Sequence, residues 1–470
     1  MKENRYDFGM IGLGTMGSNL MLNMADHGYA VIGYDKNADK TKLFEKSATK
    51  DTVVKGVNTL EEMIGQLKTP RKLMMLVPAG SPVDSVINEL KPLLQKGDII
   101  IDGGNSHFTD TLRRIIELKN IGFHFLGIGI SGGEEGARKG PSIMPGGDIE
   151  AYNEVAPILE AVAAKVNDEP CVAYLGKDAA GHYVKMVHNG IEYSIMQLIS
   201  ECYDLMHRGL QLSNEDLHQV FKDWNSGEMK SFLLEITAII FQKKDDKSKN
   251  YLVDMILDKA GAKGTGKWTS QEGLDLPMPI PTIDTAVMMR NLSSLIEERH
   301  EADSLYKTTG EKIEINRKEF ISILHDALYF STIISYAQGL ALITTASSEL
   351  KMDIPLPKVV SVWRGGCIIR SASLGLFKIA YKNKDLKNLL LDASIAELLQ
   401  QKLPAIQKIV SLAAGNNYPC AGLMSALNYY NAYRRKFLPT NLIQAQRDFF
   451  GAHTYQRIDE EGIFHTEWEK

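Results

Sequence analysis

The chain has 470 residues, of which 44% are hydrophobic and 24% are charged, with a formal net charge of -5 and a pI of about 6.2. This composition is typical of a globular protein with two or three domains and excludes an intrinsically disordered chain. The weakly acidic balance lacks the basic field that nucleic-acid binding requires, so we expect no nucleic-acid partner. No apolar run approaches the about 18 residues of a membrane span, so we expect neither membrane insertion nor export.

In residues 1–178, short apolar runs alternate with helix-like segments. The runs read FGMIGLG, AVIGYD, KLMMLVPAG, DIIIDGG and FHFLGIGISGG. Strands separated by helices predict right-handed βαβ units and a parallel sheet covered on both faces. The first domain is therefore predicted to be Rossmann-like and to bind a dinucleotide.

The first apolar run ends in a glycine-rich turn with G-x-G-x-x-G spacing, between a predicted strand and a predicted helix. The turn comprises Gly12, Leu13, Gly14, Thr15, Met16 and Gly17. Such glycines allow a tight turn and close approach of the backbone to a pyrophosphate, which the helix N-terminus favours. A purely structural glycine turn is the alternative, but the strand and helix on either side favour a dinucleotide site.

The second predicted strand ends at Asp35, at the distance of about 20 residues from the glycines that dinucleotide-binding folds use. A carboxylate there accepts hydrogen bonds from the adenosine ribose 2′-hydroxyl and repels a 2′-phosphate, which favours NAD over NADP. Lys36 follows directly and softens this discrimination. An ordinary acid in a turn after a strand is the alternative interpretation.

Three more loops follow the ends of later predicted strands, at residues 77–80, 102–106 and 131–140. An open parallel sheet binds ligands beyond the carboxyl ends of its strands. Asn105, Ser131 and the backbone amides of Gly132 and Gly133 are therefore candidates to bind hydroxyl groups or a carboxylate. Each of them, taken singly, is equally an ordinary turn residue.

Four cysteines are spread along the chain without CxxC or metal-ligand spacing: Cys171, Cys202, Cys367 and Cys420. A disulfide framework and a zinc site are therefore not expected. We expect buried free thiols, no metal, and a reducing cytoplasmic location.

Long helical periodicities dominate residues 179–436, which predicts an all-helical second domain. The charged run 242–250 is predicted to be a solvated loop, and the proline-rich run 276–284 a connector to a helix capped near Thr282 or Asp284. Residues 437–470 are too polar to pack alone and are predicted to be a tail that packs on a partner. The predicted fold class is α/β plus all-α, with a C-terminal tail.

The helix at the start of this second domain reads GHYVKMVHNGIEY over residues 181–193, and places Lys185, His188, Asn189 and Glu192 on one face. A solvated face is the ordinary interpretation. Near a nicotinamide, however, a lysine with a lowered pKa acts as a base on a hydroxyl and then stabilises the carbonyl oxygen. Glu192 suits a second proton transfer as an acid if burial raises its pKa.

Basic groups that suit a phosphate follow in the second domain and the tail: Lys263, Thr265, Arg290 and Arg447. Arginine offers a planar fork of donors and lysine a point charge. The run AGAKGTGKW lacks the spacing of a P-loop, so ATP chemistry is the poorer interpretation.

Several long motifs in the same order resemble the decarboxylating 6-phosphogluconate dehydrogenase family over essentially the whole chain. They read GLGTMG, IIIDGGNS, GISGGEEGARKGPSIMPGG, GHYVKMVHNGIEY, AGAKGTGKW, WRGGCIIR and LIQAQRDFFGAHTY. The resemblance implies oxidation of 6-phosphogluconate at C3, loss of CO2 and ketonisation to ribulose 5-phosphate without a metal. Lys185 would be the base and then the acid at the C3 oxygen, and Glu192 the acid that protonates C1 of the enediol.

The resemblance also implies ligand contacts and a homodimer. The carboxylate and hydroxyl end of the substrate would be held by Asn105, Ser131, Gly132, Gly133, His188 and Asn189. The phosphate would be held by Tyr193, Lys263, Thr265, Arg290 and Arg447. Arg447 and His453 would reach the site from the second subunit, by exchange of tails.

Cofactor contacts implied by the resemblance lie in the glycine-rich turn, at Asp35, Lys36 and Asn37, at Val77, Pro78 and Ala79, and at Asn105. The chain departs from NADP-using family members, which read Asn-Arg-Thr where Asp35, Lys36 and Asn37 stand, and carry lysine at Pro78. Both departures favour NAD as the cosubstrate. An NAD enzyme suits gluconate catabolism better than the supply of NADPH.

Two rival hypotheses remain from the residues alone. Another β-hydroxyacid dehydrogenase would share the glycine fingerprint and Lys185 but would need no phosphate clamp. A catalytically silent, dinucleotide-binding regulatory protein would be expected to lack Lys185 or Glu192, and both are present.

Overall fold

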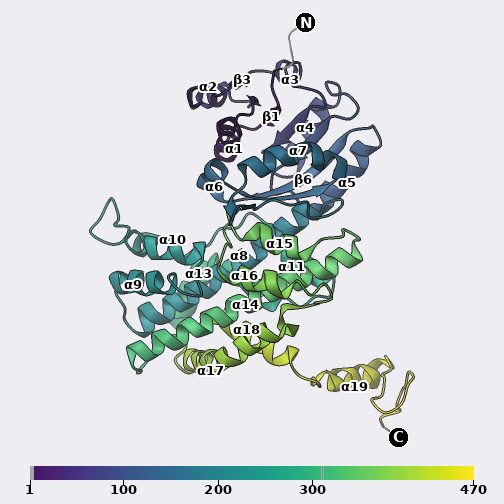
Figure 1. Cartoon of the computed structure of the whole chain (residues 1–470). Coiled ribbons are helices and arrows are strands. Elements are labelled where there is room, and N and C mark those ends of the chain that lie inside the picture. Colours follow the sequence, from purple (N-terminus) through teal and green to yellow (C-terminus); the bar gives the residue numbers. More distant parts are fainter. Residues whose placement is uncertain (1–4, 308–309, 311, 470) are drawn as a thin grey trace.

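The computed structural model describes residues 5–307, 310 and 312–469. Figure 1 shows a sheet-containing domain that rests on a larger helical domain, with the C-terminal segment projecting from the far side of the helices. The helix α8 (Ala180–Asp204) begins where the sheet domain ends and passes beneath the sheet into the helical domain.

The sheet has seven strands in the order β3-β2-β1-β4-β5-β6-β7. Strands β1 to β6 are parallel to their neighbours, whereas β7 pairs antiparallel with β6. The strands are β1 (Phe8–Ile11), β2 (Val31–Tyr34), β3 (Val54–Val57), β4 (Lys72–Met75), β5 (Ile99–Asp102), β6 (His124–Ser131) and β7 (Ser142–Gly147). A two-stranded hairpin, β8 (Lys165–Val166) and β9 (Glu169–Pro170), follows.

The five predicted strands are therefore confirmed, and two were missed. Strand β3 reads VKGV and β7 reads SIMPGG, and their glycine, proline and charged residues weaken the apolar signal that marks a strand. The expectation of a purely parallel sheet was wrong at β7, which returns along β6 as the antiparallel edge of the sheet.

Apolar side chains cover both faces of the sheet, as the continuous apolar runs predicted. In β1, Phe8 and Met10 pack in one buried cluster and Ile11 in another. Helices α1 (Thr15–Asp26) and α7 (Ile149–Val162) supply the first cluster, and α3 (Leu60–Ile64) and α4 (Ser81–Leu90) supply the second. The remaining helices of this domain are α2 (Ala38–Lys46), α5 (Phe108–Lys119) and α6 (Gly133–Lys139).

The helical domain is built around α8 and α14 (Arg317–Glu349), which pack side by side in one large apolar core. Around them lie α9 (Asn214–Trp224), α10 (Phe232–Ile240), α11 (Thr265–Asp275), α12 (Pro281–Ser293), α13 (Ile296–Tyr306), α15 (Leu356–Trp363), α16 (Ser373–Ala380), α17 (Ala393–Gly415) and α18 (Ala421–Tyr433). Helix α12 begins at Pro281, so the predicted cap near Thr282 or Asp284 was wrong; proline is well suited to the first turn of a helix.

Helix α14 corrects one sequence-based statement, because it is long and apolar enough to span a membrane by length and composition. Its most apolar window of 18 residues has a mean hydropathy of 1.3, and 89% of that window is buried. Small polar residues interrupt the apolar run, including Ser331 and Ser335, which are themselves buried. Its apolar surface therefore faces other helices of the core.

The tail carries α19 (Thr440–Gly451), which projects away from the rest of the chain in Figure 1. A bridge between Tyr455 and Phe464 folds the last residues back. The Asp448 carboxylate accepts hydrogen bonds from the backbone of Thr454 and Thr466 and from the Trp468 indole. All four cysteines are buried and unpaired, as predicted.

Candidate active site

The glycine-rich turn leaves the N-terminus of α1 uncovered. A Cβ atom at Gly12 would lie 2.5 Å from the Leu76 carbonyl oxygen, and one at Gly17 would lie 2.0 Å from the Gly12 carbonyl oxygen. Both positions therefore require glycine for packing. A Cβ atom at Gly14 would meet nothing within 4 Å, so the space in front of the helix is open to an anion.

Asp35 lies beside this turn and is held in place by two backbone groups. Its carboxylate accepts hydrogen bonds from the Leu13 amide at 2.8 Å and from the Asn37 amide at 2.9 Å. Lys40 Nζ lies 3.6 Å from the same carboxylate, whereas Lys36 pairs with Glu89 at 3.5 Å. The carboxylate is therefore fixed to the glycine-rich turn, where a nucleotide ribose binds in folds of this kind.

A cleft of about 360 Å3 lies over the turn. It is lined by the turn, by the end of β2, by the loop after β4, and by α4; the lining residues are Ile11, Gly12, Gly14, Tyr34, Asp35, Lys36, Lys40, Leu60, Leu76, Val77, Pro78, Val86 and Glu89. Ala79, beside Pro78 in the same loop, is exposed. The cleft thus unites the candidate cofactor residues of three separate loops.

The polar face of α8 is buried at Lys185 and His188 and half-buried at Asn189 and Glu192, so the interpretation of a solvated face was wrong. The side chain of Lys185 is 6% exposed, and His188 is fully buried. The ring atom His188 Nδ1 lies 3.0 Å from the Asn189 amide oxygen and 3.8 Å from the Glu192 carboxylate. Asn189 in turn donates to the Thr265 hydroxyl at 3.2 Å, which joins α8 to the start of α11.

Glycines on β6 and β7 let α8 approach the sheet this closely. A Cβ atom at Gly129 would lie 2.3 Å from the Lys185 Cβ atom, and one at Gly146 would lie 2.2 Å from the Gly181 backbone nitrogen. A Cβ atom at Gly127 would lie 2.9 Å from His182. We call Gly127, Gly129, Gly146 and Gly181 the glycine seam. Sequence reasoning missed it, although the alternation LGIGIS in a strand is its signal.

The loop after β6 adds hydrogen-bonding groups to this face. The Ser131 hydroxyl lies 3.4 Å from His188 Nε2. Because His188 Nδ1 donates to the Asn189 oxygen, Nε2 is left to accept from Ser131. Gly132 has a φ of 132°, and a Cβ atom there would lie 2.5 Å from the Gly366 carbonyl oxygen. Asn105, at the end of β5, is exposed at the tip of its loop.

Burial moves the pKa values of the three ionisable groups on this face. It lowers the pKa of Lys185 from its usual value, and Glu192 opposes that shift. Burial, and then the charge of Lys185, lowers the pKa of His188 well below its usual range. Burial raises the pKa of Glu192. The lysine is thus biased towards a neutral base and the glutamate towards a neutral acid, as each proposed role requires.

Four of the candidate phosphate ligands lie around the far end of this face. The Arg290 guanidinium carbon lies 3.5 Å from the centre of the Tyr193 ring, and Arg290 donates to the Gly261 carbonyl at 2.9 Å. Thr265 is buried at the first turn of α11, and Lys263 is exposed in the loop just before it. The structure therefore brings together residues of three separate segments, α8, the start of α11 with the loop before it, and α12.

Two further candidates are not brought to the site within a single chain. Arg447 lies on α19 and donates to Gln444, and His453 faces the Phe450 ring. Helix α19 projects away from both domains in Figure 1. These two residues are therefore separated from α8 unless the tail contacts another molecule.

A dinucleotide-binding sheet beside a buried lysine, histidine and glutamate defines a class of proteins, the nicotinamide-dinucleotide-dependent dehydrogenases. Comparison with known proteins identifies the family within it. Residues 7–176 match the NAD binding domain of 6-phosphogluconate dehydrogenase, and residues 181–468 match the C-terminal domain of the same enzyme. The chain belongs to the 6-phosphogluconate dehydrogenase family.

Individual relatives agree over the full length. The chain is 50% identical to the NADP(+)-dependent, decarboxylating 6-phosphogluconate dehydrogenase of Bacillus subtilis, with 99% of this chain and 100% of the relative covered. It is 48% identical to the decarboxylating enzyme of Escherichia coli, with 99% of each covered. The structure of the Plasmodium falciparum enzyme, described in apo, NADP+ and 6-phosphogluconate forms, matches with a TM-score of 0.95 and 45% identity, covering 98% of this chain and 100% of that one.

Proposed function

We propose that this protein oxidises 6-phosphogluconate and decarboxylates the product to ribulose 5-phosphate and CO2, with reduction of a nicotinamide dinucleotide. The observation that carries the proposal is the buried face of α8, where Lys185 has a lowered pKa and Glu192 a raised one within a chain of this family. The domains that serve it are residues 1–178 for the dinucleotide, 179–436 for substrate and dimerisation, and the tail 437–470. We also propose a cytoplasmic location.

The proposed reaction begins at the C3 hydroxyl of the substrate. The bound dinucleotide supplies an acceptor for the hydride that leaves C3. Neutral Lys185 takes the proton of the C3 hydroxyl, and the oxygen becomes a carbonyl. The resulting ammonium then returns its proton to that oxygen while the C1–C2 bond breaks. CO2 leaves, and the electron pair of the broken bond stays in the enediol.

The enediol becomes the ketose through a second pair of proton transfers. Glu192 gives its proton to the terminal carbon of the enediol, while Lys185 again takes the proton of the hydroxyl that becomes the keto group. Solvent then takes the proton from Lys185 and restores one to Glu192, so both groups return to their starting states. Because an ammonium stabilises the developing charge, we propose a route that uses no metal.

Substrate placement follows from the same face and the loops around it. We propose that Asn105, Ser131, Gly132, Gly133, His188 and Asn189 hold the carboxylate and hydroxyl end. Tyr193, Lys263, Thr265 and Arg290 hold the phosphate, together with Arg447 of a second subunit, whose His453 also reaches the site. A homodimer with exchanged tails would bring these last two residues to the site.

We propose NAD as the preferred cosubstrate, although the Bacillus subtilis relative is named as NADP-dependent. The Asp35 carboxylate is held at the glycine-rich turn by the Leu13 amide, where it repels a 2′-phosphate and accepts from a 2′-hydroxyl. Pro78 offers no charge to a phosphate. An NAD preference would suit gluconate catabolism rather than NADPH supply by the pentose phosphate pathway.

The experiment for the activity is an assay of purified protein with 6-phosphogluconate and each dinucleotide, following dinucleotide reduction and CO2 together. We expect both products in equal amounts, with kcat/KM higher for NAD than for NADP. Absence of reduction with either dinucleotide would contradict the proposed activity, and a higher value for NADP would contradict the cosubstrate alone.

Mixed dimers test the exchange of tails. We expect homodimers of Lys185→Arg and of Arg447→Ala to have low activity, the first because it lacks the base and the second because it lacks a phosphate ligand. If tails are exchanged, a mixed dimer has one site with both defects and one site with neither. A pure mixed dimer should therefore show about half of the wild-type site activity, and random reassociation of equal amounts about a quarter. Without exchange, each site would keep one defect and no activity would return.

A further inference from the structure

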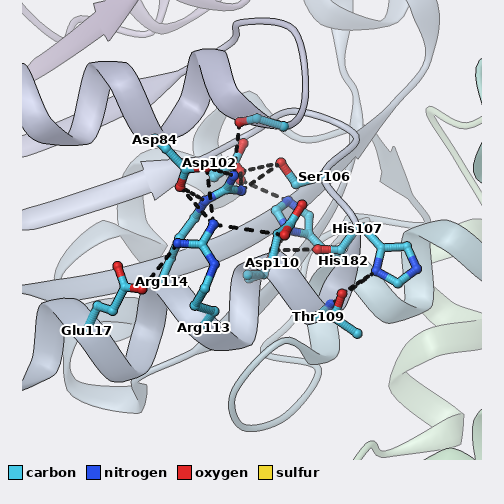
Figure 2. A network of polar contacts seen from close by, with 12 residues as sticks. Asp84, Asp102, Ser106, His107, Thr109, Asp110, Arg113, Arg114, Glu117 and His182 are labelled. Carbon is cyan, nitrogen blue, oxygen red and sulfur yellow. Dashed lines mark hydrogen bonds and ion pairs between the residues drawn. The ribbon is translucent and has the colours of Figure 1, made fainter.

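A buried polar network connects the loop that carries Asn105 to the helix that carries Lys185. We call Asp84, Asp102, Ser106, Thr111, Arg114 and His182 the Arg114 network; Figure 2 shows Arg114 at its centre, between Asp84 and Asp102. The side chains of Arg114 and Asp102 are each 1% exposed, whereas the neighbouring Arg113 is 44% exposed.

Arg114 joins two loops at the carboxyl ends of neighbouring strands. Its Nε and Nη2 atoms bind the Asp84 carboxylate at 2.8 and 3.1 Å, and Nη2 also donates to the Gly80 carbonyl at 3.0 Å. Its Nη1 atom lies 3.6 Å from Asp102 and 3.4 Å from the Ser106 hydroxyl. One guanidinium thus connects the loop after β4, which lines the dinucleotide cleft, to the loop after β5.

The Asp102 carboxylate shapes the second of these loops. It accepts from the Gly104 amide at 2.9 Å and from the Ser106 hydroxyl at 2.6 Å. Both ends of the turn are therefore fixed to one buried side chain, and Asn105 is left exposed between them. The Asp102 side chain determines where Asn105 points.

His182 connects this loop to α8. Its Nε2 atom lies 3.1 Å from the Asp102 carbonyl oxygen, and its Nδ1 atom lies 2.7 Å from the Thr111 hydroxyl. Burial lowers the pKa of His182, which favours the neutral ring. Since a carbonyl only accepts, Nε2 carries the hydrogen and Nδ1 accepts from Thr111. The Asp102 carbonyl therefore requires this tautomer, and the Thr111 hydroxyl, which also lies 3.2 Å from the His107 carbonyl, satisfies the buried Nδ1 atom.

We propose that Arg114 and His182 are positioning residues, which set the substrate loop and the dinucleotide loop relative to Lys185. Asn105 lies three residues after Asp102, and Lys185 lies three residues, about one helical turn, after His182. The hydrogen bond between His182 and the Asp102 carbonyl thus connects the loop that carries Asn105 to the helix that carries Lys185. The proposal rests on the proposed function for what these two residues do.

The first test removes the hydroxyl that binds His182 Nδ1. Thr111→Val keeps the shape of the side chain but leaves the buried Nδ1 atom without a hydrogen-bond partner, so the ring that donates to the Asp102 carbonyl is held less firmly. We expect kcat to fall about 100-fold, as for an approximately 1 Å misplacement, with dinucleotide affinity near wild type and a modest loss of thermal stability from the unpaired Nδ1 atom. Thr111→Ser retains the hydroxyl and should restore kcat.

A second substitution distinguishes positioning from general damage. In His182→Gln, the side-chain amide nitrogen reaches the place of Nε2 and donates to Asp102 without help from Thr111. We therefore expect Thr111→Val to have little further effect on kcat in a His182→Gln background. A kcat for Thr111→Val within about twofold of wild type would overturn the proposed role of this hydrogen bond. So would a double variant whose loss of kcat equals the product of the two single losses.

The Arg114 contact has a matched control one residue away. Arg113 also binds Asp84, at 2.9 Å, but it is exposed on the outer side of α5. We expect Arg114→Lys to weaken NAD binding about tenfold, because lysine lacks the fork that holds Asp84 and Gly80 together, while Arg113→Lys leaves it unchanged. Equal effects of the two substitutions on the dissociation constant would overturn this part.

The binding measurement also separates the two levels of the proposal. Dinucleotide affinity requires no turnover, so it tests Arg114 even if the wild-type protein does not oxidise 6-phosphogluconate. Wild-type turnover with unaltered kcat in Thr111→Val would contradict the positioning role and leave the proposed function intact.

Discussion

The polar face of α8 is held by close packing in the core, whereas the rim of the dinucleotide cleft carries exposed charges around the fixed Asp35 carboxylate. Lys185 lies against Gly129 with no room for another atom, and it is 6% exposed. Lys36, by contrast, has 70% of its side chain exposed, and its partner Glu89 has 43%. The polar face of α8 is therefore fixed by the core of the fold, whereas Lys36 and Glu89 can be exchanged without repacking.

The largest effect is expected at the base itself. Lys185→Arg keeps a positive charge, but arginine stays protonated and cannot take the C3 proton. We expect turnover to fall by about 10^3-fold or more while 6-phosphogluconate still binds. Calorimetry measures the binding of 6-phosphogluconate to the variant, and steady-state kinetics measures its turnover. Near-normal turnover in the variant would exclude Lys185 as the base.

Glu192→Gln should give the next largest loss, with a change in pH dependence. The base acts when neutral, so kcat rises with pH through the titration of Lys185; the acid acts when protonated, so kcat falls as Glu192 ionises at higher pH. We expect the variant to lose turnover by about 100-fold. The pH profile of its residual kcat should lack the decline at high pH. A bell-shaped profile like that of the wild type would contradict the assignment of Glu192 as the acid.

A smaller and more selective effect is expected at Asp35, in the dinucleotide cleft. Asp35→Asn removes the charge that repels a 2′-phosphate but keeps an acceptor for a hydroxyl. We expect the ratio of kcat/KM for NADP over NAD to rise about tenfold, because a charge near a partially solvated site contributes about 1 kcal/mol. Asp39→Asn, an exposed acid of α2, is the matched control and should leave the ratio unchanged.

The smallest expected effect is a difference in the free energy of unfolding between variants of the buried Lys185 and of the exposed Lys36. A buried lysine whose pKa is lowered destabilises the fold at neutral pH, because the unfolded chain binds its proton more strongly. Lys185→Met should therefore raise the free energy of unfolding by about 1–3 kcal/mol at neutral pH.

The size of this effect decreases as the pH rises. Since the unfolded lysine holds its proton up to a pKa near 10.5, wild-type stability rises between the lowered folded pKa and that value, and the advantage of methionine shrinks. Lys36→Met, in the exposed cleft, should change stability by less than about 0.5 kcal/mol at any pH. Denaturant unfolding of both variants across pH measures the difference.

The sequence predicted the parts of this fold that have a strong local signal. Five strands, the long helices α8 and α14, and the glycine-rich turn were all visible as apolar runs or fixed spacings. Strands β3 and β7 were missed, because VKGV and SIMPGG derive their stability from neighbouring strands rather than from their own composition.

The candidate site was predictable in its residues but not in its environment. The offsets on α8 indicated that Lys185 and Glu192 share a face, yet helical spacing is the same for a solvated face and a buried one. Burial arises from the glycine seam, in which Gly129 and Gly181 belong to segments about 50 residues apart and meet only after folding. The Arg114 network was missed for the same reason.

Coupled detection of reduced dinucleotide and CO2 from 6-phosphogluconate labelled at its carboxyl carbon tests the central claim most directly. The account predicts equal amounts of labelled CO2 and reduced dinucleotide with the wild-type protein, and neither with Lys185→Arg. Reduction without labelled CO2, or equal release by the variant, would contradict oxidative decarboxylation through Lys185.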